Sequence, residues 1–195
     1  KKVTDKISGE IFKNYKVDKL IRSDDNIRVI IGNEYVDYDQ VVLASHADQS
    51  LRMIEKPTEQ EKNILEKFNY VKNEAYLHTD KRLMPHKKRA WSSWNSVSDG
   101  EKTCITYWLN KLQNLDTSKD YFLTLNPICK INENSVIKKV DFTHPYLNSE
   151  NTALQKDLRL IQGKKRTWFC GSYFGYGFHE DGLKSSIDLM NNFKI

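Results

Sequence analysis

Residues 166–185 read RTWFCGSYFGYGFHEDGLKS, and this stretch decides how the rest of the sequence is interpreted. Its first five residues favour a β-strand, the segment 171–182 favours a turn, and the apolar spacing after Asp181 favours a helix. A strand, a glycine turn and a helix N-terminus in this order present backbone N–H groups and the positive end of a helix dipole to an anion. The stretch therefore predicts a binding site for an anionic group.

Glycine is scarce in the chain and unevenly distributed. The 195 residues include 8 glycines, whereas ordinary usage would give about 14. Five of the eight lie near the C-terminus: Gly163, Gly171, Gly175, Gly177 and Gly182. Because glycine tolerates backbone conformations and close approaches that other residues do not, we expect the functional backbone to be concentrated there.

The sequence outside this stretch predicts an α+β fold in three segments. Residues 1–54 read as an antiparallel meander followed by a buried strand at 40–45 and a helix at 46–54. Residues 55–162 begin with a capping box at Thr58 and Glu61 and continue as a mostly antiparallel sheet of about five strands with helices. Residues 163–195 return as strand, turn and helix, with Leu183, Ile187 and Met190 on one helical stripe.

The composition excludes several classes of protein. With 38% hydrophobic and 29% charged residues, the chain is expected to be globular, neither disordered nor membrane-spanning. The cysteines Cys104, Cys129 and Cys170 fit neither a disulfide framework nor zinc pairs, and the histidines have no metal-like spacing. These features predict a reducing, cytoplasmic environment and no metal site.

Two basic clusters beside aromatic residues leave a nucleic-acid hypothesis open. One is residues 86–89, followed by Trp91 and Trp94, and the other is residues 164–166, followed by Trp168. Cations and aromatic rings in alternation are typical of grooves that bind single strands. With a net charge of only +5, we favour the alternative that both clusters are solvated turns, so no specific nucleic-acid partner is expected.

Residues 168–185 resemble the C-terminal signature of FAD-binding oxidoreductases in the flavin-containing amine oxidase superfamily, in the branch associated with cyclopropane-fatty-acid synthase. Further stretches agree in the same order, at residues 38–49, 77–80, 90–95, 106–110 and 124–127. The resemblance spans nearly the whole chain. It implies a substrate-type antiparallel sheet flanked by the C-terminal pieces of a Rossmann-like FAD-binding domain, at residues 1–54 and 163–195.

The resemblance also implies that this chain lacks the N-terminal part of a complete protein of this kind. Such proteins begin with a Rossmann unit whose Gly-x-Gly-x-x-Gly turn holds the FAD pyrophosphate, and this sequence has no such turn and begins Lys1-Lys2 without a Met. We therefore expect the chain to be the C-terminal half of a longer protein, with the N-terminal half as its partner. Alone, it is expected to bind FAD poorly and to be inactive.

The resemblance assigns cofactor contacts to individual residues. Val17, placed in the first strand, would contact the adenine through its backbone. Gly171 and Ser172 would approach the ribityl and phosphate atoms, although related amine oxidases usually have an acidic residue at the second position. The helix start would face the flavin ring; the residues of this turn and helix start implied in cofactor binding are Gly177, Glu180, Asp181, Gly182 and Leu183. Glu180 and Asp181 could equally be acids that complement the helix dipole.

The substrate is expected to be a small molecule, apolar or a lipid. Five aromatic residues could line an apolar cavity, although core packing is the favoured alternative: Trp91, Trp94, Tyr107, Trp108 and Tyr173. No catalytic residue is identified, and His179 reads as structural. The predicted function is hydride transfer from a C–H or C–N bond to flavin. The alternatives are a non-catalytic binding or assembly module that keeps the fold, and a weak nucleic-acid binder.

Overall fold

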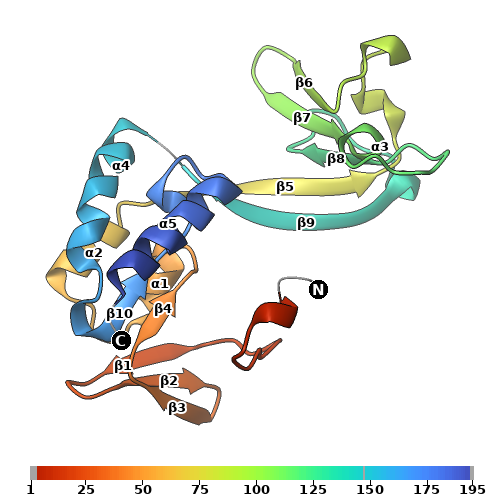
Figure 1. Ribbon diagram of the computed structural model, residues 1–195. Coiled ribbons are helices and arrows are strands. Elements are labelled where there is room, and N and C mark those ends of the chain that lie inside the picture. The colour runs from red at the N-terminus through yellow and green to blue at the C-terminus, as the bar shows by residue number, and fades with distance from the viewer. Residues whose placement is uncertain (1–3, 147, 194–195) are drawn as a thin grey trace. The chain divides into compact units, whose positions relative to one another are not determined.

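The computed structural model describes residues 4–146 and 148–193. The chain divides into two compact units: unit 1 comprises Lys1–Asn69 and Pro145–Ile195, and unit 2 comprises Tyr70–His144 (Figure 1). The two ends of the chain thus share one unit, with the middle as a second unit. The boundaries differ from those expected at 54/55 and 162/163, because the helices on either side of unit 2 pack into unit 1.

Unit 1 begins with the predicted meander. After a short 3-10 turn η1 (Thr4–Lys6), the antiparallel strands β1 (Lys19–Arg22), β2 (Ile27–Ile31) and β3 (Glu34–Tyr38) follow in order. Leu20, Ile27 and Val29 are buried, whereas β3 is exposed along its whole length. Val17 lies just before β1 and outside the strand in which the sequence places it.

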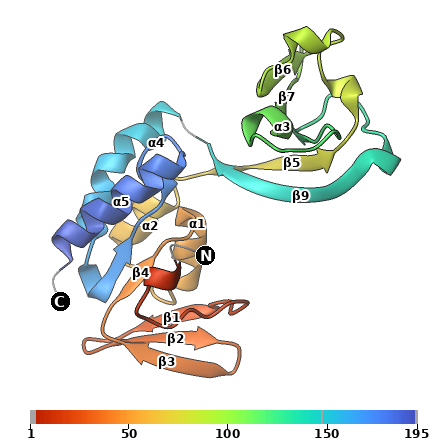
Figure 2. The same cartoon turned by 45° about the vertical axis from the view of Figure 1, so that its right-hand side comes forward.

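The second sheet of unit 1 joins opposite ends of the chain. The strands β4 (Val41–Leu43) and β10 (Thr167–Phe169) are parallel neighbours, with Val42 opposite Trp168. Figure 2 shows these strands beside the helices of the unit. Those helices are α1 (Ala47–Met53), α2 (Glu59–Leu65), α4 (Ser149–Leu154), α5 (His179–Asn192) and the 3-10 helices η5 (Gln155–Ile161), η6 (Lys164–Arg166) and η7 (Ser172–Phe174).

A buried ion pair ties three elements of unit 1 together. Arg22 of β1 donates from Nη1 and Nη2 to the two carboxylate oxygens of Glu61 on α2, at 2.6 and 2.8 Å. Arg22 Nη1 also donates to Thr167 Oγ1 of β10. Thr58 and Glu61 form the predicted capping box, in which the Thr58 N–H donates to Glu61 Oε2. Burial raises the pKa of Glu61, but the bonds from Arg22 and Thr58 outweigh burial and hold it below its usual range.

Unit 2 is built on a five-stranded sheet in the order β6-β7-β8-β5-β9. Its strands are β5 (Tyr70–His78), β6 (Trp94–Ser98), β7 (Thr103–Trp108), β8 (Phe122–Leu125) and β9 (Val136–Pro145). The pairs β5/β8, β6/β7 and β7/β8 are antiparallel. Four short helices join them: η2 (Lys81–Leu83), η3 (Lys88–Ala90), α3 (Leu109–Leu112) and η4 (Glu133–Ser135). The predicted mixture of helices with antiparallel sheets is confirmed.

A chain of polar side chains runs through the centre of this sheet. His78 Nε2 lies 2.8 Å from Thr124 Oγ1, which lies 2.8 Å from Thr106 Oγ1, and all three residues are fully buried. The Asp80 N–H donates to His78 Nδ1, so this nitrogen is the acceptor and Nε2 carries the proton. Burial lowers the pKa of His78, with the Asp80 carboxylate opposing that effect.

Candidate functional site

The carboxyl ends of β4 and β10 lie next to each other at the same end of the parallel pair. In open α/β sheets, ligands bind outside the carboxyl ends of the strands. Gly171 follows β10 with φ of 152°, and a Cβ there would lie 2.8 Å from the Tyr173 ring and 3.7 Å from the Ser45 carbonyl oxygen, just after β4. Only glycine fits this junction without strain.

Hydrogen bonds fasten the start of α5 to this junction. The Gly171 N–H donates to Ser185 Oγ at 2.9 Å, and Ser185 Oγ donates to the Gly182 carbonyl at 2.8 Å. A Cβ on Gly182 would lie 3.7 Å from the Ser172 nitrogen. The structure therefore brings together three predicted cofactor residues, Gly171, Ser172 and Gly182, which we call the strand-end cluster.

Asp181 shapes the loop that leads into α5. Its Oδ2 accepts hydrogen bonds from the backbone N–H groups of Tyr176, at 3.0 Å, and Phe178, at 2.9 Å. A Cβ on Gly175 would collide with the same carboxylate, so this loop position requires glycine. The Asp181 side chain is thus engaged by the protein itself, as an acid at a helix N-terminus often is, whereas Glu180 is exposed.

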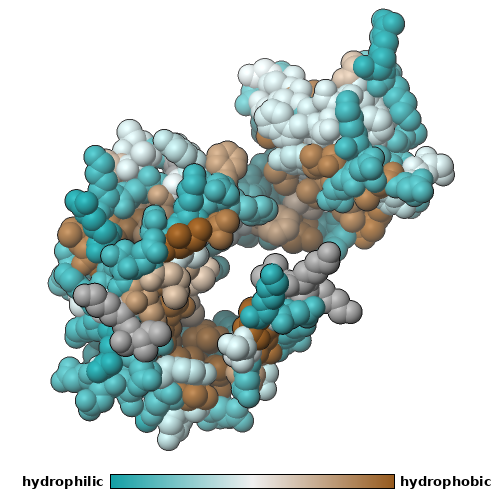
Figure 3. All heavy atoms as spheres, in the orientation of Figure 1, coloured by the Kyte–Doolittle hydropathy of each residue, from teal (hydrophilic) through white to brown (hydrophobic). Residues whose placement is uncertain are grey.

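The remaining predicted cofactor residues lie around this loop or apart from it. Gly177 has φ of +89° and belongs to the same loop. Leu183 lies on α5 and is 56% exposed, and Ile187 and Met190 on the same stripe are also exposed. The stripe therefore does not cover the core of unit 1; Ser185 and Leu189 do. Figure 3 shows apolar side chains at the surface over part of α5.

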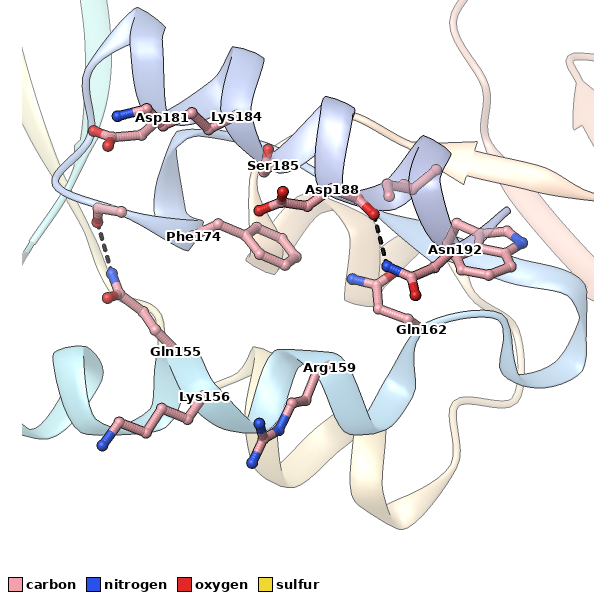
Figure 4. A pocket seen from close by; sticks show the side chains of 13 residues that line it. Gln155, Lys156, Arg159, Gln162, Phe174, Asp181, Lys184, Ser185, Asp188 and Asn192 are labelled. Carbon is pink, nitrogen blue, oxygen red and sulfur yellow. Dashed lines mark hydrogen bonds between the residues drawn. The ribbon is translucent and has the colours of Figure 1, made fainter. Parts of the chain in front are cut away.

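A cavity of about 700 Å³ lies between η5 and α5 (Figure 4). Phe174 and Asp188 point into this space, whereas the charged ends of Lys156, Arg159 and Lys184, which also line it, are exposed and directed away from the gap between the two helices. Trp168 and Leu189 form apolar parts of its lining. The lining includes Asp181 but none of the three residues of the strand-end cluster.

Two glutamines that the sequence analysis did not identify position the site. Gln162 Nε2 donates to the Phe169 carbonyl, and the Phe169 N–H donates to Gln162 Oε1, so this side chain replaces a neighbouring strand on the second edge of β10. Gln155 Nε2 donates to the carbonyls of Tyr173 and Gly175. Only tertiary structure reveals these bonds, because no spacing rule links a glutamine to a distant backbone group.

The five aromatic candidates for a substrate wall are not in one place. Trp91 is buried with Met84 and Phe122, and Trp108 packs against this cluster. Tyr173 is buried in unit 1, with its ring 5.4 Å from that of Phe68. Trp94 is 56% exposed and lies opposite Tyr107 in the β6/β7 register. Trp91 directly follows η3 and lies outside any strand.

Cations of both basic clusters contact the protein itself. Lys88 lies 3.5 Å from Asp120 and over the rings of Trp91 and Trp108. Lys164 donates to Gln60, and Arg166 donates to the carbonyls of Asp24 and Asp39. Within residues 4–146 and 148–193, no three His, Cys, Asp or Glu side chains are grouped as metal ligands, and no helix has the length and apolar character to cross a membrane.

No protein-family model and no curated protein sequence matches this chain. Solved structures do match. A CLA-producing fatty acid isomerase from P. acnes matches 99% of this chain and 50% of its own, with a TM-score of 0.68 at 14% identity. A putative protoporphyrinogen oxidase from Exiguobacterium sp. 255-15 matches 91% of this chain and 46% of its own, with a TM-score of 0.57 at 10% identity.

A cyclohexylamine oxidase from Brevibacterium oxydans IH-35A matches 91% of this chain and 48% of its own, with a TM-score of 0.55 at 10% identity. The chain thus spans about half the length of the solved structures that it matches. The chain therefore has the fold of about half of these structures, a fatty acid isomerase and two oxidases, in agreement with the fold that the resemblance of residues 168–185 implies.

Proposed function

We propose that this chain completes an FAD-dependent oxidoreductase together with a dinucleotide-binding half of the same protein. The observation that carries the proposal is the strand-end cluster, where the carboxyl ends of two parallel strands meet the start of α5. Gly171 and Gly182 let the backbone pack closely at this junction, because a Cβ would lie 2.8 Å from the Tyr173 ring at Gly171 and 3.7 Å from the Ser172 nitrogen at Gly182. The match to about half the length of two oxidases supports the same proposal.

The open edge of β4 supports the proposal that a dinucleotide-binding half pairs with this chain. Leu43 accepts a hydrogen bond from Cys170 on the β10 side, so by the alternation of a parallel ladder the backbone groups of Val42 point to the other edge. β4 has β10 as its strand neighbour and no other in the described part of the chain. Parallel sheets are normally covered on both faces and continued by further strands. A strand of the dinucleotide-binding half would pair here.

The residues of the strand-end cluster would bind and orient FAD. The backbone at Gly171 and Ser172 would lie against its ribityl and phosphate groups, and residues 181–183 would face the flavin ring. FAD supplies the hydride acceptor when it is bound. The positive end of the α5 dipole would stabilise negative charge that develops next to it. Val17 would contact the adenine from the meander.

The substrate of the complete protein is proposed to be apolar or a lipid, oxidised at a C–H or C–N bond. Trp94 and Tyr107 are the candidates for its contact surface, because Trp94 is accessible and Tyr107 lies beside it on the neighbouring strand. Trp91 and Trp108 would support that surface from the core of unit 2.

The test is to express the complete coding sequence that contains this chain and to record the flavin absorbance of the purified protein. We expect a yellow protein, and we expect Gly182→Val to lose FAD because a branched side chain would fill the approach to Ser172. Gly9→Val is the matched control, since no atom lies within 4 Å of a Cβ there. A colourless complete protein that does not take up added FAD would refute the proposal.

A further inference from the structure

Helix α5 runs back along β10. Gly171, at the carboxyl end of the strand, donates to Ser185 on the helix. Trp168, in the middle of the strand, has its ring centroid 5.3 Å from that of Phe193, which follows the helix. The two elements are therefore antiparallel and aligned, and α5 covers the sheet face that carries Trp168.

The side chains of α5 form three faces. Leu189 lies on the face that packs against β10. With about 100° of rotation per residue, Asp188 lies to one side of that face and lines the cavity toward η5 (Figure 4). Ile187 and Met190 are centred roughly a third of a turn to the other side, and they are 51% and 60% exposed. Large apolar side chains on this third face are therefore left in contact with solvent.

The third face lies on the side of the open edge of β4. Gln162, at the end of η5, occupies the second edge of β10, so η5 lies beside β10 on the side away from β4. Because the cavity face of α5 is directed to η5, Ile187 and Met190 are directed to the side of β4. Val42 of β4 is the register partner of Trp168, so it lies on the sheet face that α5 covers, where it is 42% exposed. We call Val42, Ile187 and Met190 the edge-side surface.

The spacing of secondary structure elements identifies what would cover this surface. Neighbouring strands lie about 4.8 Å apart, and packed helices lie about 8–10 Å apart. A helix beside α5 would therefore lie about two strands away from β10, over the strand that would pair with the open edge of β4. Parallel sheets are covered by helices on both faces. One strand and its covering helix would thus continue the sheet and bury all three residues of the edge-side surface.

We propose that the edge-side surface is the docking surface for a helix of the dinucleotide-binding half, the helix that covers the strand paired with β4. The inference rests on the proposed function, because it takes that half as the partner. The docking helix is amphipathic and presents apolar side chains at intervals of three and four residues to Ile187 and Met190. Leu183 of the same stripe lies in the first turn of α5, which is assigned to the flavin ring, and is not part of this surface.

The test measures the rate at which maleimide labels single introduced thiols in the complete protein that contains this chain. Ile187→Cys and Met190→Cys are compared with Asp188→Cys, the matched control, which is also exposed on α5 but lies on the cavity face. Mass spectrometry of the peptide that holds each position reads the labelling. We expect positions 187 and 190 to react roughly tenfold more slowly than position 188, since labelling then requires the docked helix to open.

The same three variants of this chain alone should react at similar rates, because all three positions are exposed in it. A complete protein that binds FAD but is labelled equally at the three positions would overturn the inference and leave the proposed function intact. A complete protein that does not take up FAD would refute the proposed function, and the inference with it. Protection of positions 187 and 190 in this chain alone that grows with its concentration would assign the surface to a second copy and would also overturn the inference.

Discussion

The two units of this chain form their sheets in opposite ways. In unit 2, one segment of the chain supplies the sheet: β6, β7 and β8 pair in succession, and β5 pairs with β8 in the same antiparallel sense. In unit 1, β4 and β10 come from distant parts of the chain and pair in parallel, with Val42 exposed on the edge strand. The difference indicates that one continuous segment suffices to form the sheet of unit 2, whereas unit 1 contains a parallel pair that a further segment could continue.

The largest loss of stability is expected when the buried ion pair between Arg22 and Glu61, which joins distant segments of unit 1, is broken. Glu61→Ala leaves Arg22 buried without its carboxylate partner, so the free energy of unfolding of unit 1 should fall by about 3–5 kcal/mol. The measurement is urea unfolding followed by the fluorine NMR signal of fluorotryptophan at position 168, since the other three tryptophans lie in unit 2.

Glu59→Ala is the matched control for that variant. Glu59 lies on the same helix but forms an exposed pair with Lys62, so its loss should cost less than about 1 kcal/mol. Equal losses for the two variants would show that the buried ion pair does not hold β1, α2 and β10 together.

A pair of glycines tests the close packing of unit 1 against the open hairpin of unit 2. Gly163 has φ of +68° and a Cβ there would lie 2.8 Å from the Trp168 ring, whereas Gly100 has φ of +99° and no atom within 4 Å. We expect Gly163→Ala to cost about 3 kcal/mol, from conformation and overpacking together, and Gly100→Ala about 1–2 kcal/mol, from conformation alone. Thermal unfolding of both variants measures this, and a reversed order would contradict it.

Acid should weaken unit 2 through His78. Burial lowers the pKa of His78 below its ordinary value of 6.5, so the folded state binds fewer protons than the unfolded state. The stabilising contribution is therefore complete above pH 6.5 and decreases as the pH falls below that value. Urea unfolding at several pH values, followed by the fluorotryptophan signals of unit 2, gives the slope. His78→Gln should reduce that slope, and an unchanged slope would assign the pH dependence to other groups.

The smallest effect is expected at the exposed tryptophan of unit 2. Trp94→Thr replaces a ring that is 56% exposed with a residue that also favours strands. The free energy of unfolding should change by less than about 0.5 kcal/mol. The proposed function predicts that, in the complete protein, the same variant raises the KM for an apolar substrate. A loss of stability above about 1.5 kcal/mol would instead show that Trp94 is part of the core.

Local signals predicted many of the elements well. The capping box at Thr58 and Glu61 marks the start of α2, and the apolar spacing after Asp181 corresponds to α5. Signals that depend on packing were less informative. The stripe of Leu183, Ile187 and Met190 has helical spacing but is exposed, because periodicity identifies a helix without saying what covers it.

The sequence by itself determined the strand, glycine turn and helix of residues 166–192 and the mixture of antiparallel sheet and helices, because these depend on backbone preference and side-chain spacing. Tertiary structure alone decided which distant groups meet: Arg22 with Glu61, Gln162 with the edge of β10, and Ser185 with Gly171. The physical reason is that hydrogen bonds between residues far apart in the chain form only after burial has brought the segments together, and no local pattern encodes them.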